Sequence, residues 1–143
     1  MGYNLEAIGT SAVLRLKSAM NRGGTIENIY MTEVKAENVR HVLAADLNWN
    51  PSYSYSTLPK EYEGKEIPEH WRIMLTPVTP PEKGYPRFRN VYVSKVKAEN
   101  VDEFISASGW NDSLRLENFY LYAIEAQTDK PVSYTHLRAH ETV

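Results

Sequence analysis

Two stretches of the chain carry nearly the same order of apolar and polar positions. Residues 26–39 read IENIYMTEVKAENV and residues 88–101 read FRNVYVSKVKAENV, and a weaker copy, LENFYLYAIEA, begins at Leu116. The apolar positions that recur are Ile29, Met31 and Val34, then Val91, Val93 and Val96, then Phe119, Leu121 and Ile124. Alternation with a period of two predicts strands. The copies that begin at Phe88 and Leu116 are 28 residues apart, and self-similarity at such a spacing predicts a solenoid. We therefore expect an all-β fold in which each copy is one coil of a parallel β-solenoid.

A further strand is predicted over residues 12–17 (AVLRLK), with Arg15 and Lys17 on the face opposite Leu14 and Leu16. This strand aligns with residues 41–46, and the spacing of the two long copies continues the alignment to residues 103–108. Because neighbouring strands lie about 4.8 Å apart, equivalent side chains should stack in columns. The expected outward columns are Arg15, Ala44, Ser106 and Lys17, Asp46, Ser108. Two cations beside small residues predict a binding site on this face.

Residues 50–86 interrupt the repeat and hold seven of the eight prolines. Proline at this density excludes a central strand. We expect a long ordered loop laid over the solenoid, with a short strand over residues 71–75 (WRIML). Its tyrosines either pack the loop onto the solenoid or line a substrate groove; they are Tyr53, Tyr55, Tyr62 and Tyr85.

The predicted organisation is a set of coils over residues 1–132 and a polar tail over residues 133–143 that does not continue the repeat and does not look native. No capping element precedes the first strand, and a solenoid normally has one. The expectation is therefore that coils before Met1 are missing. In the repeat itself, Asn28, Asn90 and Asn118 occupy equivalent positions and are expected to form a stacked ladder through their amides.

Composition narrows the function classes. The 143 residues carry 16 basic and 18 acidic side chains, a net charge of −2, which argues against a nucleic-acid or anionic-membrane surface. There is no run of 18 apolar residues to span a membrane. The absence of cysteine excludes disulfides, thiolate nucleophiles and cysteine metal sites.

The four histidines predict no metal site and no cofactor. His41 has no second ligand at metal spacing, and His70 lies in the proline-rich loop. His136 and His140 are four residues apart but belong to the tail.

The order LRLK, then GG, then IENIY, then a second copy of that coil resembles the polygalacturonases of glycoside hydrolase family 28 over about residues 5–130. In that family a strand ending in Arg-Ile-Lys precedes a glycine-rich turn and an asparagine-bearing coil; here Leu16 stands in the isoleucine position. The resemblance implies a right-handed single-stranded parallel β-helix of the pectin-lyase-like type. It also implies a secreted or periplasmic enzyme, monomeric when intact, that hydrolyses galacturonosidic bonds in an acidic plant polysaccharide (pectin) with inversion and without a metal.

By this resemblance, Arg15 and Lys17 would bind the carboxylate of a galacturonate unit, and Trp49 lies near an aromatic residue that contacts sugar in the family. From the residues alone, Arg15 and Lys17 are also compatible with a solvated stripe, and Trp49 with a packing role. The family's catalytic motifs (Asn-Thr-Asp, Asp-Asp and His-Gly) do not occur in the sequence. Asp46 is the nearest candidate acid on the face, with pairing to Lys17 as the alternative. We therefore predict no catalytic residue here and a fragment that is inactive alone.

Two other functions remain open at this point. One is a non-catalytic carbohydrate-binding β-solenoid that presents the same cationic face. The other is a purely structural repeat module, which would give no reason for Arg15 and Lys17 to alternate on one face. The sequence does not distinguish galacturonan from rhamnogalacturonan or xylogalacturonan as the substrate.

Overall fold

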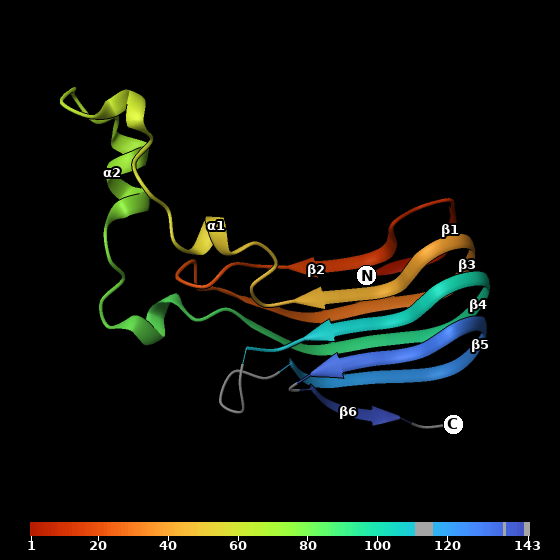
Figure 1. Cartoon of the computed structure of the whole chain (residues 1–143). Coiled ribbons are helices and arrows are strands. Elements are labelled where there is room, and N and C mark those ends of the chain that lie inside the picture. The colour runs from red at the N-terminus through yellow and green to blue at the C-terminus, as the bar shows by residue number, and fades with distance from the viewer. Residues whose placement is uncertain (111–115, 136, 142–143) are drawn as a thin grey trace.

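The computed structural model describes residues 1–110, 116–135 and 137–141, with side chains to residue 128. In this part of the chain, alternating apolar and polar residues form six strands. The strands are β1 (Gly2–Ile8), β2 (Ala12–Lys17), β3 (Thr25–Asp46), β4 (Arg87–Ser108), β5 (Leu116–Thr135) and β6 (Leu137–Glu141). They pair in parallel in one sheet of order β1-β3-β4-β5-β6, and β2 also pairs with β3 (Figure 1). The predicted all-β class is confirmed.

The long strands β3, β4 and β5 run to one end of the sheet, turn there and come back (Figure 1). Residues with a positive φ recur at equivalent places along them. They are Asn28, Glu33 and Asn38 in β3, Asn90, Lys95 and Asn100 in β4, and Asn118 and Ala123 in β5. A residue in this conformation breaks the alternation of an extended strand, and asparagine adopts it more readily than most residues. The repeated asparagines therefore allow each strand to bend at the same place as its neighbour.

The register follows the spacing of the repeats in the sequence. β3 pairs with β4 without a shift from Thr25↔Arg87 to Asp46↔Ser108. β2 pairs with β3 in the register that places Arg15 beside Ala44 and Lys17 beside Asp46. The predicted columns are therefore confirmed.

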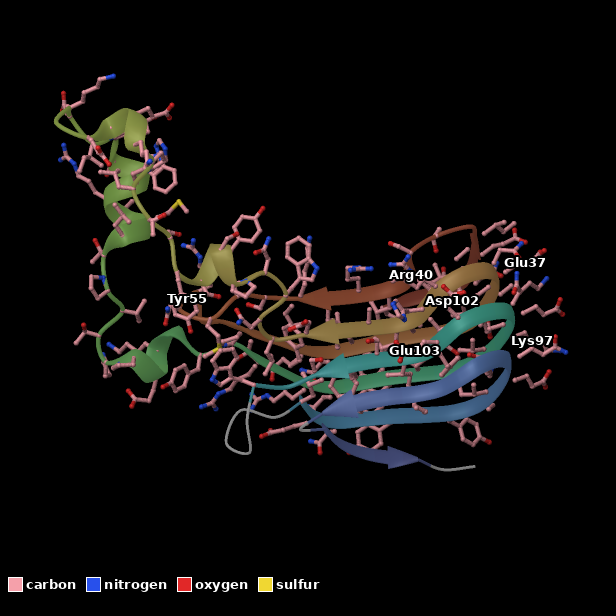
Figure 2. The ribbon with its side chains drawn as sticks, viewed as in Figure 1. Glu37, Arg40, Tyr55, Lys97, Asp102 and Glu103 are labelled. Atoms are coloured by element: carbon pink, nitrogen blue, oxygen red, sulfur yellow. The ribbon has the colours of Figure 1, made fainter. Side chains whose placement is uncertain are left out.

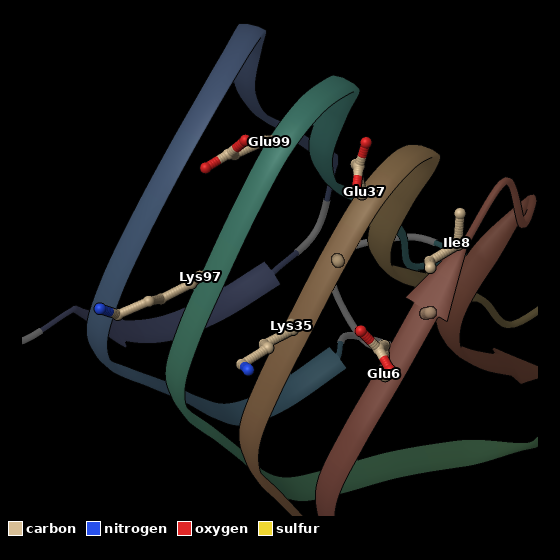
Figure 3. Close-up of a pocket in the computed structure, with 8 residues that line it drawn as sticks. Glu6, Ile8, Lys35, Glu37, Lys97 and Glu99 are labelled. Carbon is tan, nitrogen blue, oxygen red and sulfur yellow. The ribbon is translucent and has the colours of Figure 1, made fainter.

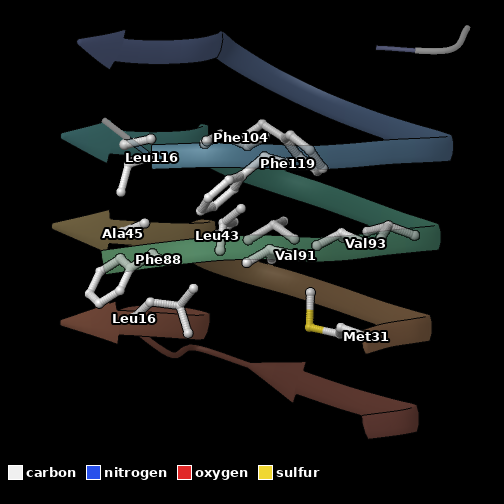
Figure 4. Packing of buried hydrophobic residues seen from close by; sticks show 14 of the residues in the cluster. Leu16, Met31, Leu43, Ala45, Phe88, Val91, Val93, Phe104, Leu116 and Phe119 are labelled. Carbon is white, nitrogen blue, oxygen red and sulfur yellow. The ribbon is translucent and has the colours of Figure 1, made fainter. Parts of the chain in front are cut away.

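The apolar core lies between the outgoing and returning halves of the bent strands. Phe88 and Val91 come from the outgoing half of β4, while Leu43 belongs to the returning half of β3, and all three are almost completely buried (Figure 4). Leu16 on β2 joins the same cluster, with Phe119 from β5. Burying each such side chain contributes about 1.5–3 kcal/mol, so the inward positions of the repeat supply the main stabilisation of the fold.

Identical polar and aromatic side chains stack from strand to strand on the outer positions. Asn90 donates its amide to Asn28 Oδ1 (3.2 Å), and Asn118 donates to Asn90 Oδ1 (3.0 Å), which confirms the predicted asparagine ladder. Tyr92 stacks on both Tyr30 and Tyr120 with ring centroids 4.7 Å apart in each pair. Each ladder fixes the register of the strands that it joins.

Residues 50–86 form an arm that extends away from the end of the sheet (Figure 1). It contains α1 (Pro51–Ser54), the 3₁₀ turn η1 (Lys60–Tyr62), α2 (Glu69–Leu75) and the 3₁₀ turn η2 (Pro81–Gly84). The expectation of a loop laid over the sheet is wrong, because α2 stands clear of the strands and buries none of its residues.

The predicted strand over residues 71–75 is also wrong, since these residues belong to α2. Pro68 directly precedes the helix, Glu69 lies in its first turn and Arg72 in its last turn, and these charges match the helix dipole. Within the described part of the chain, no sheet edge lies beside the arm to pair with an extended segment (Figure 1).

The C-terminal part of the chain continues the parallel pairing beyond the boundary drawn at residue 133. In β5, Ser133, Tyr134 and Thr135 pair with Ser106, Ala107 and Ser108 of β4. β6 then pairs with the start of β5 from Leu137 onward. The side chains of this region, His140 among them, and the whole of His136 lie outside the described residues.

Candidate functional site

The columns that begin at Arg15 and Lys17 lie on the outer face of the returning strands. Across β2, β3 and β4 the first column runs Arg15, Ala44, Ser106. Its side chains fall sharply in size from the first strand to the next two. A guanidinium therefore stands at one side of a floor of small residues.

A shallow hollow of about 120 Å³ occupies this floor. Arg15 and Trp49 line it, together with His41 and Asp46 at its sides. The structure thus brings two of the three predicted site residues, Arg15 and Trp49, to one concave surface. Lys17, the third, lies at its margin, in contact with Trp49.

The two cations are held in different ways. Arg15 is exposed, and its Nη2 lies 3.4 Å from Ser11 Oγ, so most of its donors face solvent. The Lys17 ammonium lies over the Trp49 ring, 4.0 Å from the ring centroid. A cation–π contact at an exposed site contributes about 0.5–1 kcal/mol, which is enough to favour one position of a flexible lysine.

The expected pairing of Lys17 with Asp46 is not found. Within the described residues no ion pair joins them, although their strands are adjacent. Asp46 Oδ1 instead accepts a hydrogen bond from the Asn48 backbone amide (2.8 Å), which stabilises the turn after β3. Trp49 follows in that turn and offers Lys17 a closer partner.

Trp49 forms an aromatic pair with Tyr53 from α1. The ring centroids are 5.9 Å apart and the ring planes differ by 13°, a stacked arrangement. Trp49 remains 40% exposed and Tyr53 remains 51% exposed. The sequence alone predicts Tyr53 only as one of the loop tyrosines and does not predict this contact. One local signal was present: Asn50-Pro51 is a typical helix start, which predicts that the chain turns directly after Trp49.

His41 and Glu103 form a half-buried pair beside the hollow. His41 Nδ1 lies 3.4 Å from Glu103 Oε2 and makes no hydrogen bond in the described structure. Figure 2 shows Glu103 on the sheet, away from the charged residues Glu37 and Lys97 at the bend. The spacing of the two long copies already aligns His41 with Glu103, as the strand register confirms.

The hollow has too few carboxylates for acid–base hydrolysis. Among the described residues that line it, Asp46 is the one carboxylate. Inverting hydrolysis uses an acid and a base about 6.5–9.5 Å apart across the bond. The described residues also contain no group of three or more histidine, aspartate or glutamate side chains that would hold a metal ion.

A second hollow, of about 280 Å³, lies at the bend of the strands (Figure 3). Its walls alternate in charge, with Lys35 and Lys97 on one row and Glu37 and Glu99 on the next, and Glu6 beside them. Because both signs are interspersed, this hollow does not favour an anionic ligand, whereas the first hollow presents an exposed guanidinium.

No family model matches the sequence, and neither a curated protein nor a solved structure matches it. In the described residues, no helix has the length and apolar character needed to cross a membrane.

Proposed function

We propose that the bent parallel strands belong to a right-handed single-stranded parallel β-helix, and that the chain is part of a hydrolase acting on galacturonosidic bonds in pectin. The unshifted register of β3 on β4 and the asparagine ladder that joins β3, β4 and β5 support the fold. The resemblance of residues 5–130 to the polygalacturonases supports the activity. On this proposal the protein acts outside the cytoplasm, on an acidic plant polysaccharide.

One observation carries the substrate class: Arg15 and Trp49 line the same hollow above a floor of small residues, with Lys17 at its margin. A guanidinium donates two parallel hydrogen bonds to a carboxylate, and an ammonium adds a second positive charge. The apolar face of a pyranose ring can pack against the part of the indole that Lys17 and Tyr53 leave exposed. A galacturonate unit presents both features, a carboxylate and an apolar ring face.

The chemistry requires groups beyond this chain. In inverting hydrolysis a carboxylic acid protonates the leaving oxygen while a carboxylate activates water on the opposite side of the sugar. The hollow offers Asp46 alone among the described residues, and Asp46 accepts a backbone hydrogen bond. We assign this chain the binding of the sugar acid and place the acid and base on other coils of the enzyme, so the chain alone is expected to bind without turnover.

A non-catalytic carbohydrate-binding protein is the second candidate. The single carboxylate among the described residues of the hollow favours it, because a binding surface needs cations and aromatic rings but no acid pair. Both candidates share the same ligand chemistry, and they differ in whether a longer form of the protein that supplies the acid pair releases sugar ends.

Calorimetric titration with oligogalacturonates tests the binding. We expect Arg15→Ala to weaken binding by about 2 kcal/mol, roughly thirtyfold, as loss of a charged hydrogen bond does. Lys35→Ala is the matched control, since it removes a similar charge at the bend and should leave the affinity unchanged. Neutral galactan oligomers should bind weakly to every variant.

Three results would contradict parts of the proposal. If Arg15→Ala binds oligogalacturonate as well as the parent, Arg15 does not hold the carboxylate. If galactan binds as tightly as oligogalacturonate, the cations do not select the ligand. Release of reducing ends by the chain itself would contradict the expected inactivity.

A further inference from the structure

The first segment of the arm is fastened to the turn between β2 and β3. Arg22 donates from Nε to the Tyr53 carbonyl (3.0 Å), and Asn21 donates from Nδ2 to the Ser54 carbonyl (3.1 Å). The buried Ser54 hydroxyl donates to Asn48 Oδ1. The backbone of Tyr53 and Ser54 is therefore held by two side chains of this turn.

Local sequence sets the shape of α1 as well. Asn50 is the N-cap, and its Oδ1 accepts hydrogen bonds from the Ser52 backbone amide (3.0 Å) and hydroxyl (2.8 Å). Pro51 at the first position has a φ that already suits a helix. This short turn brings Tyr53 next to Trp49, so the stacked pair does not depend on the outer part of the arm.

The result is a rigid aromatic surface that stays exposed. Tyr53 keeps 51% of its surface in solvent although its backbone is held by hydrogen bonds. Trp49 touches Lys17 on one side of the site and lines the hollow that contains Arg15. An exposed ring beside two cations is complementary to a polymer with both apolar ring faces and carboxylates.

We propose that Tyr53 is an additional sugar subsite, which stacks on a neighbouring unit of the chain whose carboxylate is held at Arg15. This inference rests on the proposed function and adds the direction of the substrate, from the hollow past Trp49 to α1. Because the backbone is held and the Tyr53 ring already stacks on Trp49, little conformational entropy is lost on binding, which favours affinity.

The alternative is that Tyr53 only supports Trp49 by packing. Substrate length separates the two roles. A subsite beyond Trp49 affects oligomers that reach it and leaves galacturonate monomer unaffected. A packing role would alter Trp49 and so affect monomer and oligomer alike.

Calorimetric titrations of the whole chain with galacturonate monomer and with oligogalacturonates of increasing length test this. We expect Tyr53→Ala to weaken the binding of long oligomers by roughly three- to tenfold, which is the effect of losing one aromatic contact. The affinity for the monomer should stay unchanged. Tyr53→Phe keeps the ring and should retain parent affinity. Tyr55→Ala is the matched control, because Tyr55 is similarly exposed (57%) two residues away and should have no effect (Figure 2).

Each outcome decides the inference. Equal oligomer affinity for Tyr53→Ala and the parent overturns the subsite while leaving the role of Arg15 intact. Equal losses for monomer and oligomer overturn it in favour of packing. If the parent binds no oligogalacturonate, both the proposed function and the subsite are wrong. A circular dichroism spectrum of each variant that matches the parent excludes misfolding as the cause of a loss.

Discussion

Asn90 occupies the middle of the asparagine ladder, and its substitution measures how strongly the ladder holds the bent strands together. Its amide donates to Asn28 (3.2 Å), while its own Oδ1 accepts from Asn118 (3.0 Å). Its φ is 56°, a conformation that asparagine adopts more readily than alanine. Two separate contributions to stability therefore depend on one side chain.

The magnitude follows from those contributions. Asn90→Ala removes two hydrogen bonds worth about 1 kcal/mol each, and the left-handed alanine costs about 1 kcal/mol more. The free energy of unfolding should fall by about 3 kcal/mol. Asn90→Gly loses the same bonds but accepts the conformation, so its loss should be about 2 kcal/mol. Asn28→Ala, which breaks one of the two bonds and has a φ of 59°, should also lose about 2 kcal/mol.

Urea unfolding followed by circular dichroism measures these differences. The midpoint should shift while the slope stays the same, because the surface exposed on unfolding does not change. An Asn90→Ala variant within about 1 kcal/mol of the parent would refute the role of the ladder. Equal losses for alanine and glycine at this position would refute the contribution from the left-handed conformation.

Two further substitutions test other parts of the fold. Gly84→Ala would place a Cβ 2.8 Å from Asn21 Cα, so we expect the contact at the base of the arm to loosen. The free energy of unfolding should fall by about 1–3 kcal/mol, and proteolysis within residues 50–86 should become faster. Unchanged proteolysis would contradict the importance of this contact. Partial desolvation, and then repulsion from the phenolates of Tyr30 and Tyr120, raises the pKa of Tyr92 above its ordinary value of 10.0. Because the unfolded chain loses this proton at a lower pH than the folded chain, stability should fall as the pH rises above 10.0. In urea unfolding, Tyr92→Phe should reduce this fall of the midpoint with pH. An identical pH dependence in both proteins would contradict the role of Tyr92.

The strand register could be predicted from the sequence because the same side chains recur at a constant spacing. That spacing places Tyr30 on Tyr92 and Asn28 on Asn90, and both pairs are in contact. A shift of one residue would turn Val91 outward and break both ladders together. The hydrophobic pattern and the ladders agree at both positions, and this agreement is why the register of β3 on β4 could be predicted.

The arm could not be predicted in this way, because its residues repeat nothing. The segment WRIML has a strand-like composition, but none of the described strands lies beside it to supply hydrogen-bond partners. The segment therefore forms the helix α2, which satisfies its own backbone. That separation is a tertiary property. Pro68 and Glu69 are local helix-start signals, but they are weaker than the apolar run that follows them.

The candidate site was predictable on the strands and not beyond them. Arg15 was correctly placed beside Ala44 by aligning residues 12–17 with residues 41–46. The partner of Lys17 was not, because the choice between Asp46 and Trp49 depends on the path of the turn after β3. In that turn Asp46 accepts from the Asn48 amide, and Trp49 donates its backbone amide to the Ser18 carbonyl (3.1 Å).

The place of the hollow follows from the same stacking that stabilises the sheet. Where neighbouring strands carry equal side chains, as at Tyr30 and Tyr92, each ring fills the space above the next. Where a large side chain is followed by small ones, as from Arg15 to Ala44 and Ser106, the stack cannot fill the surface and a concavity remains. A parallel stack therefore leaves a concave space where its columns stop repeating. In this chain that place is also where the arm leaves the sheet and brings aromatic rings to the edge of the space.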